Sequence, residues 1–258
     1  MHDWLSPQYL FQLMSGLEMT LLLALASGIA TTLIGVLLGL CHETGIDALV
    51  RLAKAYTLVF RNTPLLVQLL LWYFGVAGVL PDALVTWLNT PHRVLILGLP
   101  LSWPAFEFVA GWWGLTLYSA AFIAEECRAG LSGVPVAQRQ AGAALGLTRV
   151  QNFRFVALPQ ALRIVTPALF GQYMNLVKNS SLTMAIGFAE LSYQTRAVES
   201  ATFKTFQTYG ISTVLYIGVI ALLEVALQYV RRYQRTPPIR QNAAPPRDVA
   251  IGVIDNAR

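Results

Sequence analysis

The sequence predicts an all-α integral membrane protein with about five transmembrane helices. Of its 258 residues, 55% are hydrophobic and only 12% are charged. A soluble domain of this size carries about 25% charged residues, so the composition is typical of a chain that lies in lipid. Long runs without charged side chains, with basic residues gathered between them, support the same prediction.

Five charge-free runs define the expected spans, because a helix needs about 20 apolar residues to cross the hydrocarbon core. The runs are 19–42, 62–81, 108–124, 164–177 and 205–223, and the fourth must extend at one end to reach the required length. We therefore expect spans at about 17–41, 58–80, 108–128, 158–178 and 205–230. Residues 81–107, which contain four prolines, are expected to form an external loop with a short interfacial or re-entrant segment.

The basic residues predict the orientation. They are absent before Arg51 and then gather after the first span, between the third and fourth spans, and after the fifth. Because such residues concentrate in cytoplasmic segments, we expect a periplasmic N-terminus, a cytoplasmic loop at 129–157 and a cytoplasmic C-terminus. This topology accounts for the net charge of +5, so no nucleic-acid partner is expected.

Residues 1–235 are expected to form one membrane domain, and the proline-rich segment 236–258 a disordered tail. No basic n-region precedes the first span, which favours a retained helix over a cleaved signal peptide. Gly35 and Gly39 have the GxxxG spacing that lets helices approach closely. Packing within the chain is the simpler interpretation of this spacing, and a dimer face is the alternative.

The fourth span is followed by polar residues and then by a second apolar stretch, which predicts a helix broken near membrane depth. Such a break is tolerated only where it faces protein or a water-filled cavity. Lys178 in this segment is a candidate for binding a substrate carboxylate, or it pairs structurally with Glu125. Arg61 is a further ionisable candidate, for which snorkelling or an ion pair between helices is the simpler explanation. The candidate pathway residues are Asn175, Lys178, Asn179, Ser180, Ser181, Glu125 and Arg61.

Enzyme signatures are missing from the sequence. None of the three lysines follows the glycine pattern of a phosphate-binding loop, and neither HExxH, GxSxG nor a metal-spaced His/Cys cluster is present. We therefore expect no catalytic residue, no metal and no bound cofactor, and an intramembrane enzyme is disfavoured.

The predicted cytoplasmic loop contains a short helix with a face of small residues. Pro135 can open this helix, Ala137, Ala141 and Ala144 lie near one stripe, and glycines remove bulk beside it. Such a helix can seat in a partner's groove. An amphipathic connector on the lipid surface is the alternative.

The residues of this loop resemble a known motif. Gln140-Ala141-Gly142, then Gly146, and Val156-Ala157-Leu158-Pro159 at the far end are similar to the EAA loop of ABC importer permeases. That loop runs Glu-Ala-Ala, three residues, Gly, nine residues, Ile, any residue, Leu-Pro. Two departures are Gln140 for the Glu and Gly142 for the second Ala, which puts an ion pair to the ATPase in doubt but not docking by shape.

Other stretches resemble the polar amino acid branch of that family: 60–68 (FRNTPLLVQ), 119–128 (SAAFIAEECR) and 175–182 (NLVKNSSL). The resemblance extends over about residues 16–232 and implies the type I importer (MetI-like) transmembrane fold. It also implies a multi-pass location in the bacterial inner membrane.

The resemblance implies partners as well: two ATP-binding subunits, a second permease subunit that is homologous or identical, a periplasmic solute-binding protein and the lipid bilayer. ATP and Mg are then bound by the ATPase subunits. The helix 140–147 becomes the coupling helix, and L-amino acids, glutamate or aspartate among them, become the substrate. The coupling residues are Gln140, Ala141, Gly142, Ala144, Leu145, Gly146, Leu147, Leu158 and Pro159.

Two other interpretations remain open on the residues. A stand-alone secondary transporter would use Glu125 or Glu126 as a proton or sodium site. A membrane scaffold without transport would make the broken helix and the EAA-like loop incidental.

Overall fold

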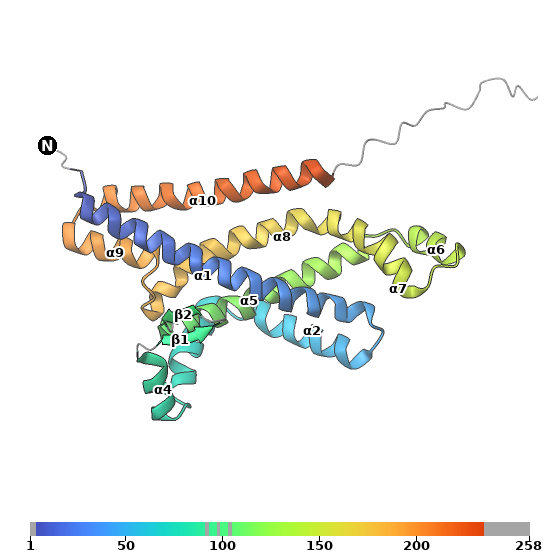
Figure 1. The fold of residues 1–258 in the computed structure, drawn as a ribbon, viewed down its shortest axis with the longest axis horizontal. Helices are drawn as coiled ribbons and strands as arrows, with labels where there is room; N and C mark the ends of the chain where they lie inside the picture. Colours follow the sequence, from blue (N-terminus) through green and yellow to red (C-terminus); the bar gives the residue numbers. More distant parts are fainter. Residues whose placement is uncertain (1–3, 91–92, 97–98, 103–104, 235–258) are drawn as a thin grey trace, which may run out of the picture.

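The computed structural model describes residues 4–90, 93–96, 99–102 and 105–234, and this part of the chain is almost entirely helical (Figure 1). Four long helices lie along its long axis: α1 (Pro7–Leu40), α5 (Phe106–Ser132), α8 (Leu158–Ser180) and α10 (Thr205–Gln234). The N-terminus and the α6–α7 segment lie at opposite ends of this axis (Figure 1). The predicted tail, 236–258, lies outside the described residues.

The helices α1 and α5 form the centre of the packing. Helix α8 lies against both of them, α9 (Leu191–Thr202) packs on α1, and α10 packs on α8 and α9. A Cβ atom added to Gly35 would lie 2.6 Å from the Ile123 side chain, and one added to Gly39 would lie 2.6 Å from the Cβ atom of Cys127. The GxxxG spacing therefore serves packing within the chain, as its simpler interpretation predicts.

Within the described residues, three continuous helical stretches have the length and apolarity needed to cross a membrane: Pro7–Glu43, Arg149–Ile186 and Thr205–Tyr233. Helix α5 is long enough, with 27 residues, but is not in this set. Its buried face includes small residues such as Gly111, Gly114 and Ala120. Neighbouring helices can therefore pack closely against α5 and shield it from lipid. The total of about five spans stays a prediction.

The second predicted span, 58–80, is not one helix. Helix α2 (Asp47–Asn62) ends before Thr63, and α3 (Leu65–Leu70) continues into a π-helical turn, η2 (Leu71–Gly75). Pro64 causes the break: Thr63 before it is extended, with φ −104° and ψ 134°, because a residue that precedes proline is disfavoured in the helical region.

Residues 81–107 contain more structure than a loop. Helix α4 (Asp82–Asn89) is followed by two antiparallel strands, β1 (Arg93–Ile96) and β2 (Leu99–Ser102), with Arg93 opposite Ser102. The sequence analysis did not predict this hairpin. Figure 1 places it beside α4, away from the α6–α7 end.

The predicted break after the fourth span is present. Helix α8 changes to a 3-10 helix, η4 (Ser181–Ile186), and the chain turns at Gly187, whose φ is +86°. Only glycine adopts such a positive φ at little cost. The chain then enters α9, a helix that the sequence analysis did not predict, before α10 returns along the molecule.

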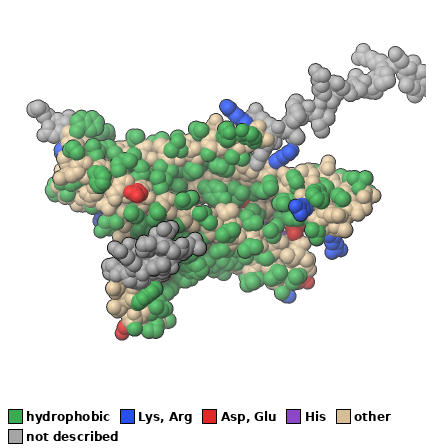
Figure 2. All heavy atoms as spheres, in the orientation of Figure 1, with side chains coloured by type: hydrophobic (Ala, Val, Ile, Leu, Met, Phe, Trp, Pro, Cys, Tyr) green, Lys and Arg blue, Asp and Glu red, His purple; other side chains and the backbone are tan. Residues whose placement is uncertain are grey.

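Hydrophobic side chains are spread over the whole visible face, and few charged side chains appear among them (Figure 2). Many of them are on the long helices, including Leu25, Leu33, Leu37 and Leu222, which are at least 63% exposed. Exposed leucines in such numbers would be unfavourable in water but suit contact with lipid or with other membrane subunits.

Candidate functional site

The loop between α5 and α8 folds into two short helices. Helix α6 (Val136–Ala144) starts after Pro135, and α7 (Arg149–Asn152) runs through a π-helical turn, η3 (Phe153–Ala157), into α8. The helix expected at 140–147 begins earlier, at Val136, and ends at Ala144. Leu145, Gly146 and Leu147 form the turn that follows it, while Leu158 and Pro159 begin α8.

Gly146 sets the sharp turn between the two helices. Its φ is +81°, and its N–H donates to the Ala143 carbonyl at 2.9 Å, while the Leu147 N–H donates to the Gly142 carbonyl at 3.2 Å. These two bonds are those of a Schellman motif, which satisfies carbonyls at a helix end. Thr148 then caps α7, because its hydroxyl accepts from the Gln151 N–H and its own N–H donates to the Gln151 side chain.

The outward face of α6 is made mostly of small residues, with the polar Gln140 among them. Gln140, Ala141, Ala144 and Gly146 are exposed, and the Leu145 side chain is 83% exposed at the helix end. The face has little bulk to prevent close approach, and Leu145 supplies an apolar anchor. This surface can enter a groove on another protein.

The inward face of α6 contacts Asn152 of α7 closely at Gly142. Gly142 is buried, and a Cβ atom added to it would lie 2.9 Å from Oδ1 of Asn152. The Asn152 amide donates to the Arg139 carbonyl at 2.6 Å. Asn152 therefore ties the two helices together in the space that Gly142 leaves.

The polar residues at the end of α8 separate into two groups. Ser180 is buried, and its hydroxyl donates to the Val177 carbonyl, while the Ser181 hydroxyl donates to the Lys178 carbonyl, both at 2.7 Å. These bonds satisfy carbonyls at the end of the helix, and a role of both serines in the pathway stays a prediction. Asn175 and Lys178 are exposed and Asn179 is half-buried, so these three remain candidates.

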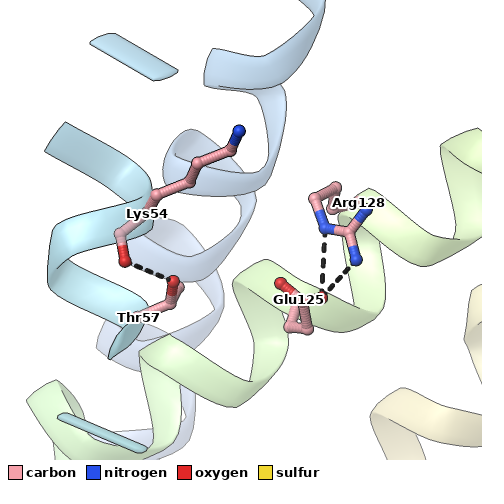
Figure 3. A network of polar contacts seen from close by, with 4 residues as sticks. All are labelled: Lys54, Thr57, Glu125 and Arg128. Carbon is pink, nitrogen blue, oxygen red and sulfur yellow. Dashed lines mark hydrogen bonds and ion pairs between the residues drawn. The ribbon is translucent and has the colours of Figure 1, made fainter. Parts of the chain in front are cut away.

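Glu125 does not pair with Lys178, which corrects one of the two alternatives for that lysine. Glu125 accepts hydrogen bonds from Arg128 one turn along α5 (Figure 3). Lys54 and Thr57 of α2 lie across from this pair (Figure 3). Among the described residues no ion pair involves Lys178.

Arg61 lies on α2, with its guanidinium 5.2 Å from the centre of the Phe122 ring on α5. A hollow of about 360 Å³ opens here, lined by Lys54, Thr57, Leu58, Arg61, Asn62 and Phe122. The structure therefore holds Arg61 by a cation–π contact rather than by an ion pair. No group of three or more potential metal ligands occurs in the described ranges.

A buried carboxylate joins three helices near the other end of the molecule. Glu190 is fully buried, caps α9 by accepting from the Tyr193 N–H at 2.8 Å, and accepts from Thr20 of α1 at 3.3 Å and from Tyr216 of α10 at 2.9 Å. Burial raises the pKa of Glu190, and these hydrogen bonds oppose the rise. The sequence analysis did not single out Glu190.

A family model described as "Binding-protein-dependent transport system inner membrane component" matches residues 32–233. The chain belongs to this family. Its branch is that of the amino acid ABC permeases, because it is 33% identical to the probable glutamine ABC transporter permease protein GlnM of Bacillus subtilis (strain 168), over 85% of this chain and 91% of GlnM. It is also 29% identical to the glutamate/aspartate import permease protein GltJ of Escherichia coli (strain K12), over 89% of each chain.

Solved structures show the same fold. The permease superposes on a chain of a crystal structure of an amino acid ABC transporter with histidines, with a TM-score of 0.73, 31% identity, and coverage of 90% of this chain and 99% of that one. It also superposes on a chain of the inward-facing MetNI methionine ABC transporter, with a TM-score of 0.67 and 23% identity, over 90% and 100% of the two chains. The expected type I importer transmembrane fold is confirmed, and the family to which the permease belongs consists of transport components.

The geometry explains one departure of the permease from the EAA pattern. Where that pattern has its second alanine, Gly142 makes room for the Asn152 amide. Gln140 is exposed on the outward face and has no hydrogen-bond partner among the described residues, so its side chain is available to a partner. Sequence reasoning missed Asn152, and only its spacing from Gly142 across a helical hairpin would have indicated it.

Replacing Gly142 by alanine tests this contact. We expect Gly142→Ala to loosen the α6–α7 hairpin, because the added methyl group displaces Asn152 and costs about 1–3 kcal/mol. Hydrogen exchange of the α6 amides in the purified permease should increase. Asn152→Ser, which keeps Gly142 but removes the amide that donates to the Arg139 carbonyl, should also speed exchange. Unchanged exchange in both variants would show that the Gly142–Asn152 contact does not hold the hairpin.

Proposed function

We propose that this permease is the membrane-spanning subunit of an ATP-driven importer that translocates L-amino acids delivered by a periplasmic binding protein. The observation that carries the proposal is the α6–α7 hairpin. It combines an EAA-like pattern with an exposed, small-residue face at one end of a membrane domain. Such a face suits a partner that pushes on the permease from outside the lipid.

In this scheme α6 is the coupling helix of the importer. Two ATPase subunits bind ATP and Mg, and their closure moves α6 and the helices attached to it between inward-open and outward-open arrangements. The residues of the outward face and its turn, Gln140, Ala141, Ala144, Leu145 and Gly146, meet the ATPase. Gly142 and Leu147, and Leu158 and Pro159 at the start of α8, keep the hairpin in shape.

The remaining partners follow from the same scheme. A second permease subunit, identical or homologous, completes the pathway, and a solute-binding protein docks on the periplasmic side. The N-terminus is then periplasmic and the α6–α7 end cytoplasmic in a bacterial inner membrane. The basic residues near this end and the opposite position of the N-terminus support that orientation.

For the substrate we propose an L-amino acid with an acidic side chain, glutamate or aspartate. Lys178 supports this choice, because it is an exposed cation at the break after α8 with no carboxylate paired to it in the described residues. The similarity to GltJ agrees with it. A secondary transporter that uses Glu125 as its ion site is less favoured, because Arg128 already occupies that carboxylate.

The role of α6 predicts the effect of bulk at its end. We expect Gly146→Trp to reduce ATP-dependent amino acid uptake at least about tenfold, because the strained turn and the large ring keep α6 out of its groove. The measurement is uptake of labelled amino acids by the complete complex in proteoliposomes, together with co-purification of the two permease subunits. Uptake at the wild-type level would make the hairpin a simple connector.

Gly45 offers a matched control for this variant. It also has a positive φ, +71°, and open space around its Cβ position, but it lies in the turn between α1 and α2. Gly45→Trp should therefore leave uptake close to that of the wild type. Equal losses in both variants would indicate general damage by tryptophan rather than a blocked coupling helix.

The role of Lys178 predicts a change in selectivity. We expect Lys178→Gln to raise the KM for glutamate by about tenfold and the KM for glutamine much less, because only the acidic side chain loses a charged partner. Lys178→Arg keeps the charge and should keep the preference. Equal changes in the KM values for both amino acids would show that Lys178 does not recognise the substrate side chain.

A further inference from the structure

We propose that Arg139 is the positioning residue that fastens the coupling helix α6 to the membrane helices α1 and α5. Motion of α6 would then pass directly into these two helices, in addition to passing along the chain. This inference rests on the proposed function, because it concerns how an ATPase-driven movement of α6 reaches the transport pathway.

The Arg139 side chain reaches two different elements. One terminal nitrogen lies 3.1 Å from Oε2 of Glu43, in the 3-10 turn η1 (Cys41–Glu43) that follows α1. The other donates to the Leu131 carbonyl at 2.7 Å, in the last turn of α5. A helix C-terminus has carbonyls without helical donors and a partial negative charge, so it suits a guanidinium. The two arms therefore join α6 to the ends of both helices.

The backbone of Arg139 makes a third connection, since its carbonyl accepts the hydrogen bond from Asn152 of α7. One residue thus links η1, α5, α6 and α7. Beside it lies a hollow of about 450 Å³, lined mainly by residues of η1, α7 and η3, with Arg139 and Arg149 as its cations and Glu43 as its carboxylate. Other side chains do not fill this hollow. The Arg139 guanidinium is therefore a principal contact between α6 and the turn that follows α1.

The strength of this link lies in its geometry rather than in its charge. Arg139 and Glu43 are each about one-third exposed, and an ion pair of that kind contributes little stability alone. A planar guanidinium, however, fixes the directions of both acceptors at once, and a lysine ammonium does not. We therefore expect losses of coupling to exceed losses of folding when Arg139 is changed.

The test uses the complete importer: this permease with its second permease subunit, its ATPase subunits and its binding protein, reconstituted in proteoliposomes. ATP hydrolysis and amino acid uptake are measured in the same preparation for Arg139→Glu, for Glu43→Arg and for the double variant. Arg51→Gln is the matched control, because it removes a basic residue of α2 for which the structure gives no ion pair.

For Arg139→Glu we expect uptake per ATP hydrolysed to fall about tenfold while the ATPase subunits still co-purify. The double variant restores the ion pair with reversed charges but not the hydrogen bond to the Leu131 carbonyl, so it should recover part of the lost uptake and not all of it. Arg51→Gln should behave as the wild type. Wild-type uptake per ATP in Arg139→Glu, or a double variant no better than the single ones, would overturn the proposal.

Two further variants test the Arg139 link if the complex does not assemble with Arg139→Glu. Arg139→Lys and Glu43→Gln each weaken the bridge without reversing a charge, and uptake per ATP should fall about threefold in both. Unchanged coupling in both would overturn the proposal. A failure of the proposed function gives a different result, because the wild-type complex itself would then show no ATP-dependent uptake. If only the Arg139 proposal fails, the wild-type complex transports and the Arg139 variants transport equally well.

Discussion

The close contact between α1 and α5 determines where the rest of the permease can lie. Two glycines of α1 meet Ile123 and Cys127 of α5 with no space for a side chain between them. In lipid, helices gain little from the hydrophobic effect and associate through such close packing. Helices α2 and α8 then lie on α5, and α8 and α9 on α1, so the α1–α5 contact sets the position of both ends of the molecule.

The same environment explains how the breaks in the helices are built. Between α2 and α3, the amide of Gln68 donates to the carbonyls of Phe60 and Thr63, which the break leaves without helical donors. At the end of α8, the hydroxyl groups of Ser180 and Ser181 likewise donate to backbone carbonyls, those of Val177 and Lys178. Backbone polar groups must be satisfied within the protein at membrane depth, and these side chains satisfy them. The side chain of Lys178 takes no part in these bonds, although its carbonyl accepts from Ser181.

Much of this architecture is predictable from the sequence, because long charge-free runs and proline positions act locally. The runs located α1, α8 and α10, and the Lys178–Ser181 segment located the break after α8. The EAA-like pattern identified the α6–α7 segment, although the helix starts at Val136 rather than at Gln140. The break at Pro64 was not predicted, because the charge-free run 62–81 was assigned to one span.

Contacts between distant residues were not predictable from a single sequence. Nothing in the sequence joins Arg139 to Glu43, 96 residues away, or Glu190 to Thr20 and Tyr216. Arg139 entered the sequence analysis only as one positive charge among several. Its two acceptors become evident once α5 and α1 end beside each other, which is a property of the fold.

Docking of α6 on an ATPase subunit is the step on which the proposed transport cycle depends most. The most direct measurement replaces the exposed Leu145 by a photo-crosslinking amino acid and irradiates the membranes of cells that produce the whole complex. We predict a cross-link between Leu145 and the ATPase subunit, and none from Leu222 on α10, which is also exposed, at 72%. Cross-links from Leu145 to lipid alone would contradict it.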